Sequence, residues 1–227
     1  MTCPSSLTPG PVSHRCCVRM TANNFLSMAN GGDCVGEKLA PFNPSGDEVI
    51  RTAIDMLQVG HADVVYDLGC GDGRMLIEAI KTSGARGVGV EYDKRFADRA
   101  HQRVAEAGLG SKITIIHANV LDIDPTGATA VFVYLIPAGM LAVREALVAL
   151  LKAGARVVTY VFSMPDLVPV RVETFKATKI YLYTATSLGN ASSLEDVSEA
   201  SSFKNVSEAS SMEWASSTSD QAQDNPA

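Results

Sequence analysis

The segment "VVYDLGCGDGR" at residues 64–74 places an acidic residue and three closely spaced glycines directly after an apolar run. Asp67 stands two residues before Gly69, and Gly71 and Gly73 follow at alternate positions. Glycines, which lack Cβ, let a chain turn tightly beneath a ligand, and a carboxylate can accept hydrogen bonds from that ligand. The pattern predicts a small-molecule binding loop, called here the glycine loop (residues 67–74).

The spacing in the glycine loop argues against two kinds of phosphate site. A P-loop needs Gly-x-x-x-x-Gly-Lys-Ser/Thr, and this loop has neither that spacing nor a lysine after its last glycine. The dinucleotide fingerprint Gly-x-Gly-x-x-Gly needs its third glycine where Arg74 stands. The remaining order, acidic-x-Gly-x-Gly-x-Gly, resembles motif I of the S-adenosylmethionine-dependent methyltransferases. That cofactor carries no phosphate, and its amino end can meet a carboxylate such as Asp67.

Polar residues also end the next two apolar runs. Glu91 lies 22 residues after Gly69, where an acidic side chain can accept hydrogen bonds from both ribose hydroxyls of a nucleoside. Asn119 follows the third run with Val120 beside it, and in this methyltransferase class an amide or acidic residue there reads the adenine edge. Asp122 is the alternative to Asn119 if the strand register is shifted.

Apolar runs alternate with amphipathic segments between about residues 42 and 186, which predicts an α/β domain. The helix that begins this part is expected to start in a capping box, Ser45 to Glu48. Four of the strands are nearly continuous apolar runs, typical of a parallel sheet covered by helices on both faces. We expect strands at 62–68, 86–92, 112–117, 128–136 and 155–162, and helices at 45–59, 73–84, 94–109 and 138–154.

The last part of the domain has a different pattern. Residues 170–186, "VRVETFKATKIYLYTAT", contain two β-like runs with no helix between them and predict an antiparallel hairpin. A mostly parallel, Rossmann-like sheet that ends in such a hairpin is the layout of the class I methyltransferases, whereas a dinucleotide-binding fold would continue with another parallel unit.

Composition changes at both ends of the chain. Residues 1–32 contain no Asp or Glu, and we expect a disordered or targeting segment over residues 1–40. The methyltransferase domain is expected over residues 41–187. Residues 188–227 are rich in Ser and Glu and repeat with a period of nine, as in "SLEDVSEAS" and "SFKNVSEAS". Such a segment buries too little apolar surface to fold, so we expect a disordered tail.

Charge and cysteine content narrow the functional classes. The net charge of −6 argues against a broad electrostatic contact with nucleic acid, and no apolar window is long enough for a transmembrane helix. The five cysteines show no metal-site spacing and are odd in number, which predicts reduced thiols and no metal. We therefore expect an intracellular protein that binds no nucleic acid, with the cytoplasm favoured over the mitochondrion.

Four segments carry a closer resemblance: "PFNPSGDEVI", "VVYDLGCGDGR", "GVGVEYD" and "VFVYLIP". Together they resemble the protein-lysine N-methyltransferase family that includes the enzymes acting on the ATP synthase c-subunit and their short prokaryotic relatives. The resemblance implies S-adenosylmethionine as cofactor and a protein lysine as acceptor. It implies that a segment before the first strand folds over the methionine end of the cofactor. The implied cofactor contacts are Phe42, Pro44, Ser45, Asp67, Gly69, Cys70, Gly71, Gly73, Glu91, Tyr92, Asn119 and Val120.

The acceptor side is expected after the fourth strand, at "YLIPAG" (residues 134–139). Methyltransferases of planar base amines or glutamine carry Asn/Asp-Pro-Pro-Tyr/Phe there, so this sequence favours an aliphatic amine. A lysine must arrive neutral, which predicts an apolar mouth with an aromatic residue. Tyr134 is the candidate catalytic residue, lining that mouth or orienting the amine. Cys70 has no neighbouring histidine and is not expected to be a nucleophile.

Two alternatives to a lysine methyltransferase stay open. The first is a small-molecule N- or O-methyltransferase, although such enzymes usually add a helical lid, and only about 20 helix-compatible residues precede Asp63. The second is a non-catalytic, cofactor-binding partner subunit. An inactive relative is expected to lose the loop glycines or the ribose acid, and this chain keeps both.

Overall fold

The computed structural model describes residues 20–21, 39 and 43–189. All of these residues belong to one compact unit, Met1–Ala191. Phe42, most of the expected N-terminal segment and the chain from residue 190 onward lie outside the described residues. The predictions for those parts therefore stay predictions.

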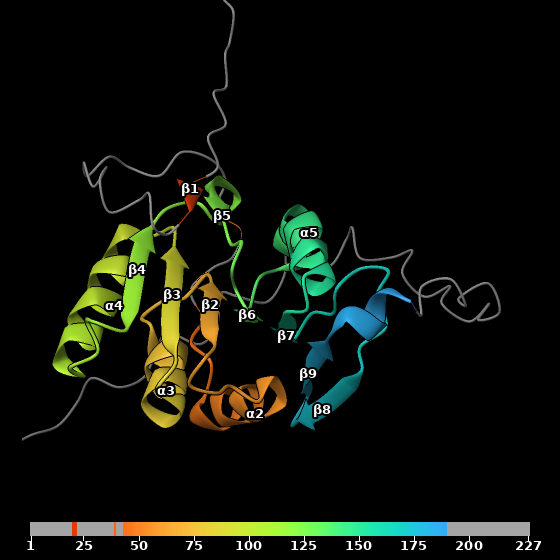
Figure 1. Cartoon of the computed structure of the whole chain (residues 1–227), viewed down its shortest axis with the longest axis horizontal. Coiled ribbons are helices and arrows are strands. Elements are labelled where there is room, and N and C mark those ends of the chain that lie inside the picture. The colour runs from red at the N-terminus through yellow and green to blue at the C-terminus, as the bar shows by residue number, and fades with distance from the viewer. Residues whose placement is uncertain (1–19, 22–38, 40–42, 190–227) are drawn as a thin grey trace, which may run out of the picture. The chain divides into compact units, whose positions relative to one another are not determined.

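Seven strands of the described chain form one mixed sheet in the order β4-β3-β2-β6-β7-β9-β8 (Figure 1). The strands β4, β3, β2, β6 and β7 are parallel, and the antiparallel hairpin of β8 and β9 is added at β7. This topology confirms the expected class I methyltransferase sheet. The strands are β2 (Val64–Leu68), β3 (Arg86–Glu91), β4 (Ile113–His117), β6 (Ala130–Val133), β7 (Arg156–Tyr160), β8 (Arg171–Phe175) and β9 (Thr178–Tyr183).

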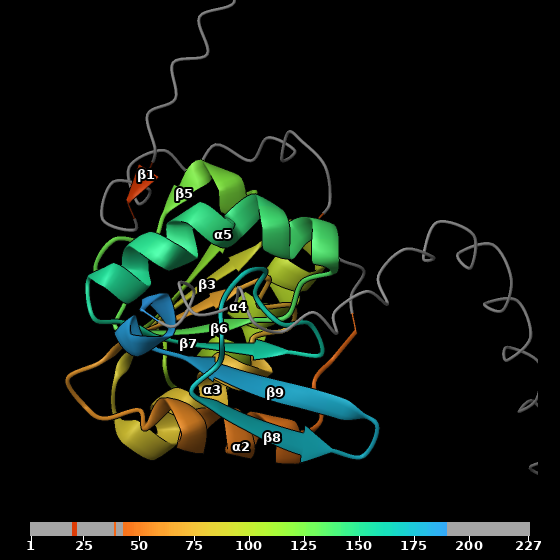
Figure 2. The ribbon, with the colours of Figure 1, turned by 90° about the vertical axis from the view of Figure 1, so that its right-hand side faces the viewer.

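Helices cover both faces of the sheet, as expected. Side chains of α2, α3 and α4 form one apolar core with one face of the sheet, and α5 forms the second core with the other face (Figure 2). The parallel strands thus bury both faces, which explains their nearly continuous apolar sequences. The helices are α2 (Asp47–Leu57), α3 (Arg74–Ser83), α4 (Lys94–Glu106) and α5 (Pro137–Lys152), with short 3-10 turns η1 (Val120–Asp122) and η2 (Ala185–Leu188).

The start of α2 differs from its prediction. The N-cap is Gly46, which makes no side-chain cap hydrogen bond, so the expected capping box at Ser45 is wrong. Asp47 and Glu48 instead occupy the first turn, where acidic side chains interact favourably with the helix dipole. By contrast, α3 ends as predicted, because Gly84 takes the left-handed conformation that terminates the helix.

A smaller ladder lies beside η1. β1 (Met20–Thr21) pairs in parallel with β5 (Ile123–Asp124), which directly follows η1. This ladder is separate from the seven-stranded sheet.

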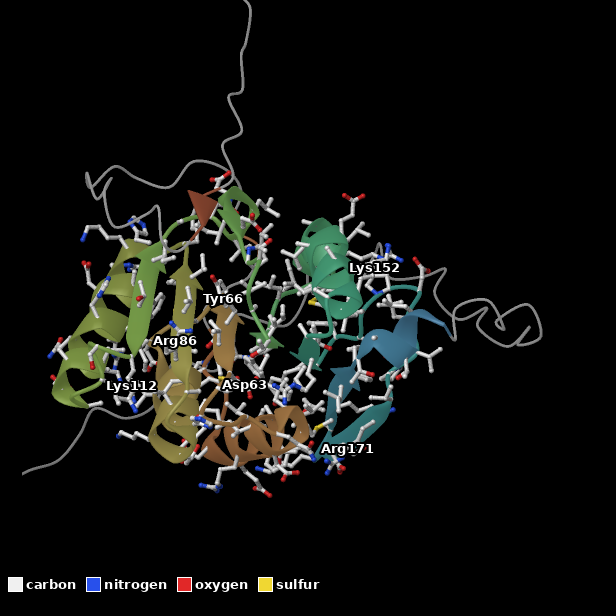
Figure 3. The ribbon with its side chains drawn as sticks, viewed as in Figure 1. Asp63, Tyr66, Arg86, Lys112, Lys152 and Arg171 are labelled. Carbon is white, nitrogen blue, oxygen red and sulfur yellow. The ribbon has the colours of Figure 1, made fainter. Side chains whose placement is uncertain are left out.

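The amino-terminal edge of the sheet is held by polar contacts around Asp63. Asp63 directly precedes β2, the strand that carries Tyr66 (Figure 3). Its carboxylate forms an ion pair with Arg156 at the start of β7 and accepts a hydrogen bond from the Thr129 hydroxyl. These contacts join two parallel strands and the turn before β6, away from the carboxyl ends where the glycine loop begins.

Candidate active site

The glycine loop follows β2 at the carboxyl edge of the sheet and requires its glycines. The φ angles of Gly69, Gly71 and Gly73 are +95°, +55° and +76°, a backbone region that residues with a Cβ rarely adopt. A Cβ on Gly69 would lie 3.3 Å from Leu135 Cδ2. The amides of Gly69 and Cys70 both donate to the Val90 carbonyl, at 2.9 and 3.0 Å. These two hydrogen bonds attach the loop to β3, and its glycines allow the backbone to make this tight turn.

Asp67 is the first residue of the glycine loop and is 3% exposed. Its pKa is raised to about 8, first because burial disfavours the charged carboxylate and then because the carboxylates of Glu91 and Asp72 are close. A cation brought beside Asp67 would favour its ionised form. The position therefore suits the ammonium group of an amino-acid moiety.

Glu91 links the glycine loop to the end of β3. Its Oε2 accepts a 2.8 Å hydrogen bond from the Gly71 amide, and its Oε1 accepts one of the same length from the Asp93 amide. Because each carboxylate oxygen offers two lone pairs, Glu91 can still accept hydrogen bonds from a pair of ribose hydroxyls. Its neighbour Tyr92 is partly buried, and the Tyr92 carbonyl lies 3.1 Å from His117 Nε2 at the end of β4.

Asn119 and Val120 follow β4, as predicted. The Asn119 side chain is 5% exposed, and its oxygen accepts a 3.0 Å hydrogen bond from the Leu121 amide, which caps η1. Asp122, the alternative residue, is exposed. Val120 lines a pocket between η1, β5 and α5. The other residues that line this pocket are Leu68, Leu121, Ile123, Pro125, Ala142, Val143, Glu145 and Ala146.

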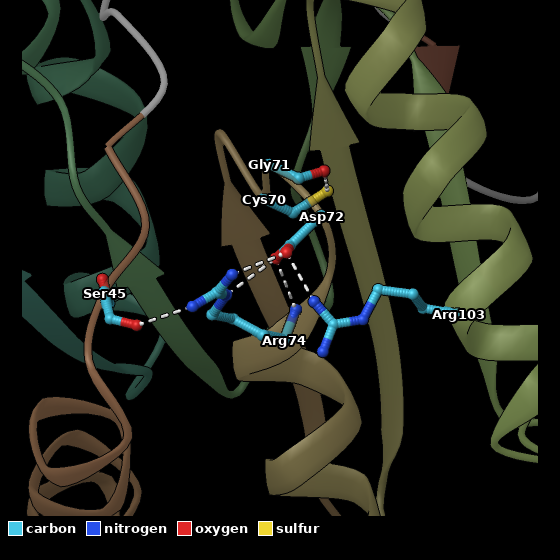
Figure 4. A network of polar contacts seen from close by, with 6 residues as sticks. All are labelled: Ser45, Cys70, Gly71, Asp72, Arg74 and Arg103. Atoms are coloured by element: carbon cyan, nitrogen blue, oxygen red, sulfur yellow. Dashed lines mark hydrogen bonds and ion pairs between the residues drawn. The ribbon is translucent and has the colours of Figure 1, made fainter. Parts of the chain in front are cut away.

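An ion-pair network that includes two residues of the glycine loop was not predicted from the sequence (Figure 4). Asp72, 2% exposed, accepts hydrogen bonds from Arg74 at 2.9 and 2.8 Å and from Arg103 of α4. Burial alone would raise the pKa of Asp72, but the two guanidinium groups outweigh it and hold the pKa below its usual value. A third Arg74 nitrogen lies 3.4 Å from the Ser45 carbonyl. The network joins the glycine loop to α4 and to the segment before α2.

A second unpredicted arrangement surrounds Tyr134, which follows β6. The Asn43 amide nitrogen donates a 2.9 Å hydrogen bond to the Tyr134 hydroxyl. The ring of Tyr160, at the end of β7, meets the Tyr134 ring edge-on, with centroids 4.8 Å apart and planes at 61°. Burial raises the pKa of the Tyr134 hydroxyl, so it stays protonated at neutral pH. Asn43, Tyr134 and Tyr160 are called here the tyrosine cluster.

The tyrosine cluster lies at the same sheet edge as the glycine loop. Val133, the residue before Tyr134, pairs with Leu68, the residue before Gly69. Of the other predicted residues in the segment before α2, Pro44 is exposed and Ser45 is partly buried.

Cys70 is a packing residue of the loop. It is 6% exposed, and burial raises the pKa of its thiol well above the usual value. A Cβ added to Gly89 of β3 would lie 2.7 Å from Cys70 Sγ, so the thiol fills space that only a glycine leaves open. Such a thiol is a poor nucleophile because the thiolate is disfavoured.

The sheet order, the terminal hairpin and the glycine cradle above a buried acid together define a class I methyltransferase. Their donor and acceptor groups could hold S-adenosylmethionine, with Asp67 available for its ammonium group and Glu91 for its ribose. Within the described residues no group of three His, Cys, Asp or Glu could hold a metal ion. None of the described helices is long and apolar enough to cross a membrane.

Comparison with known proteins identifies the family. The chain is 32% identical over 125 residues to a protein-lysine N-methyltransferase of Saccharolobus islandicus, which covers 55% of this chain and 78% of that protein. The model of the ANTKMT methyltransferase domain matches residues 67–171. The chain therefore belongs to the methyltransferase family that includes this Saccharolobus islandicus relative and is described by the ANTKMT domain model. It is an S-adenosylmethionine-dependent methyltransferase.

Other relatives act on RNA. The fold is similar to that of an RNA methyltransferase from Salinibacter ruber solved in complex with S-adenosyl-L-homocysteine, with a TM-score of 0.61 and a sequence identity of 33%. The superposition covers 63% of this chain and 93% of the Salinibacter ruber chain. Over 76 residues the chain is also 36% identical to a 23S rRNA (uracil(1939)-C(5))-methyltransferase from Bordetella pertussis. This match covers 34% of this chain and 16% of that protein. These likenesses give no support to the expectation that nucleic acid is excluded.

Proposed function

We propose that this protein is a protein-lysine N-methyltransferase. The observation that carries the proposal is the tyrosine cluster, two partly buried tyrosines and an exposed asparagine, all uncharged, beside the glycine loop at the carboxyl edge of the sheet. A lysine amine is nucleophilic only when it is neutral, and apolar surroundings lower its pKa. The likeness to the Saccharolobus islandicus lysine methyltransferase supports the same acceptor.

We assign the cofactor contacts along the edge from β4 to β6. Asp67 faces the amino end of S-adenosylmethionine, Glu91 accepts from its ribose hydroxyls, and Asn119 with Val120 meets the adenine. Phe42, Pro44 and Ser45 cover the methionine end. The backbone and side chains that complete the cradle belong to Gly69, Cys70, Gly71, Gly73 and Tyr92. When bound, the cofactor supplies an electrophilic methyl group on its sulfonium.

On the acceptor side, Tyr134 orients the amine. Its hydroxyl is protonated and accepts from Asn43, so it is not a general base. Its remaining lone pair can accept an N–H of the neutral amine, which leaves the nitrogen lone pair free for in-line attack on the methyl carbon. The C–N bond forms as the S–C bond breaks, and the amine proton passes to solvent. Held in this geometry, the reaction needs no covalent enzyme adduct.

An RNA methyltransferase is the second candidate, favoured by the Salinibacter ruber structure. Three features weigh against it. The chain after β6 reads Tyr-Leu-Ile-Pro instead of the Asn/Asp-Pro-Pro-Tyr/Phe of enzymes that methylate planar base amines, which argues against that kind of RNA methylation. The chain also carries no net positive charge that would attract phosphates in general. The tyrosine cluster, all of whose members are described residues, contains no basic side chain that could contact an RNA phosphate.

One labelling experiment separates these candidates. Purified protein is incubated with methyl-tritiated S-adenosylmethionine and a cell extract, and the products are divided into protein, RNA and small molecules with protease and nuclease arms. We expect label in protein and, after acid hydrolysis, in methylated lysine. Label in RNA alone or in small molecules alone would overturn the lysine proposal. Gly71→Arg, which blocks the cradle, is the inactive control and should abolish labelling in every fraction.

We also propose a domain organisation and a compartment. The catalytic domain covers residues 41–187, preceded by a disordered or targeting segment and followed by the disordered repeat tail of residues 188–227. The protein acts in the cytoplasm, with the mitochondrion as the alternative. Cell fractionation tests the compartment, and limited proteolysis that trims the chain to about residues 41–187 would support the organisation.

A further inference from the structure

The strand β7 ends in a turn that its sequence disfavours. Val161 follows Tyr160 with a φ of +68°, and the Phe162 amide donates a 2.9 Å hydrogen bond to the Tyr160 carbonyl. A hydrogen bond between residues two apart, around a central residue of positive φ, forms the rare and strained kind of γ-turn. For a β-branched residue this conformation is a true outlier. The other non-glycine residues of positive φ in the described chain are Gln58, Asp166 and Lys176.

Contacts on both sides of the turn maintain this conformation. The Val161 amide donates to the Lys179 carbonyl of β9 at 2.9 Å, and the Thr159 hydroxyl donates to the Phe162 carbonyl at 2.7 Å. Strained backbone persists only where surrounding structure over-determines it, and such sites gather where function needs a fixed geometry.

The γ-turn holds one member of the tyrosine cluster. Tyr160 is the last residue of β7, and the turn directs the chain out of the sheet directly after it. Its ring contacts Tyr134 edge-on, and its hydroxyl lies 3.2 Å from the Thr178 hydroxyl of the hairpin. The ring is thus fixed by Tyr134, by the hairpin and by the backbone that follows it.

We infer that the strained turn at Val161 holds Tyr160 against Tyr134, and that Tyr160 is a positioning residue that forms the second wall around the methyl acceptor. This inference rests on the proposed role of Tyr134 in binding the acceptor. Tyr134 orients the reacting nitrogen, and Tyr160 fixes the Tyr134 ring. Because a misplacement of about 1 Å at a reacting group costs about a hundredfold in rate, the fold retains an unfavourable backbone conformation at this position.

Replacing Val161 by glycine tests the inference, because glycine adopts positive φ without strain. Val161→Gly relieves the strain at this φ but raises the entropy of the unfolded chain, so the melting temperature should change little while the turn becomes looser. We expect kcat/KM for methylation of protein in a desalted cell extract to fall about tenfold or more. The affinity for S-adenosyl-L-homocysteine, measured by calorimetry, should stay within about twofold because the glycine loop is untouched.

The matched control is Lys176→Gly, which relieves a φ of +52° in the β8–β9 hairpin. It should keep or raise the melting temperature without changing methyl transfer. Unchanged kcat/KM in Val161→Gly would overturn the inference, and so would an equal fall of kcat/KM in Lys176→Gly. Tyr160→Phe, which keeps the ring, should retain most activity, whereas Tyr160→Ala should lose as much as Val161→Gly.

The result is separable from that of the proposed function. Wild-type labelling of RNA or small molecules, with no methylated lysine, contradicts the proposed acceptor. Kinetics of Val161→Gly on whichever fraction the wild type labels then still decide whether the turn positions the acceptor wall.

Discussion

The side-chain amide of Asn43 donates a 2.9 Å hydrogen bond to the hydroxyl of Tyr134, 91 positions further along the chain. This bond joins two of the four segments that carry the resemblance to lysine methyltransferases, "PFNPSGDEVI" and "VFVYLIP". Asn43 precedes α2 and Tyr134 follows β6. Their contact makes a single polar link on the acceptor side of the site.

Removing this link should slow methyl transfer without weakening cofactor binding. Tyr134→Phe keeps the ring packing on Tyr160 but loses the hydroxyl, and we expect kcat to fall about tenfold, as for one lost orienting hydrogen bond. Asn43→Ala should act through the same bond, so the double variant should be little slower than Tyr134→Phe. Additive losses, or a matching loss of affinity for S-adenosyl-L-homocysteine, would contradict the shared role.

Glu91 should be needed for both cofactor affinity and loop structure. Glu91→Ala leaves the amides of Gly71 and Asp93 without their carboxylate acceptor. Glu91→Gln turns an amide N–H toward one of them. We expect both variants to bind S-adenosyl-L-homocysteine at least tenfold more weakly by calorimetry and to unfold at lower temperature. Glu106→Gln, at an exposed position on α4, is the control and should leave both values unchanged. Normal affinity in Glu91→Ala would refute the ribose assignment.

The pH dependence of stability should reveal the buried acid. The pKa of Asp67 is about 8 in the fold against an ordinary value of 3.8. Between these values the folded state holds a proton that the unfolded state lacks, so the free energy of unfolding falls as pH rises, by at most about 1.4 kcal/mol per pH unit. Asp67→Asn, neutral throughout, should remove this slope. Denaturant titrations of the cofactor-free protein at pH 5, 6.5 and 8 measure it, and parallel curves for both proteins would contradict the raised pKa.

The tight packing of the loop on β3 should make Gly89 intolerant of a side chain. A Cβ there would lie 2.7 Å from Cys70 Sγ and 2.9 Å from both Ile115 Cδ1 and Leu76 Cδ1. Gly89→Ala should therefore destabilise the protein by about 1–3 kcal/mol, the usual effect of overpacking. Thermal and chemical unfolding measure this. Gly110→Ala, whose Cβ would meet nothing within 4 Å, serves as the control, and an equal effect in both variants would show that packing is not the cause.

Much of this protein could be predicted from local sequence patterns. The strand–helix alternation, the terminal hairpin, the glycine loop and the acid at the end of β3 depend on residues close together in the chain. Apolar periodicity, turn residues and glycine spacing report such features directly. The capping box at Ser45 failed because a cap is decided by a shift of one residue, which a pattern does not resolve.

Only the tertiary structure decided which distant side chains meet. Arg103 lies 31 positions from Asp72, and Asn43 lies 91 positions from Tyr134. Parallel strands bring such residues together through crossover helices, so no local pattern marks the pairs. The strain at Val161 was equally hidden, because a β-branched residue in a strand pattern predicts extended backbone. The sequence by itself determined the glycine loop, and folding determined how Asn43, Tyr134 and Tyr160 come together.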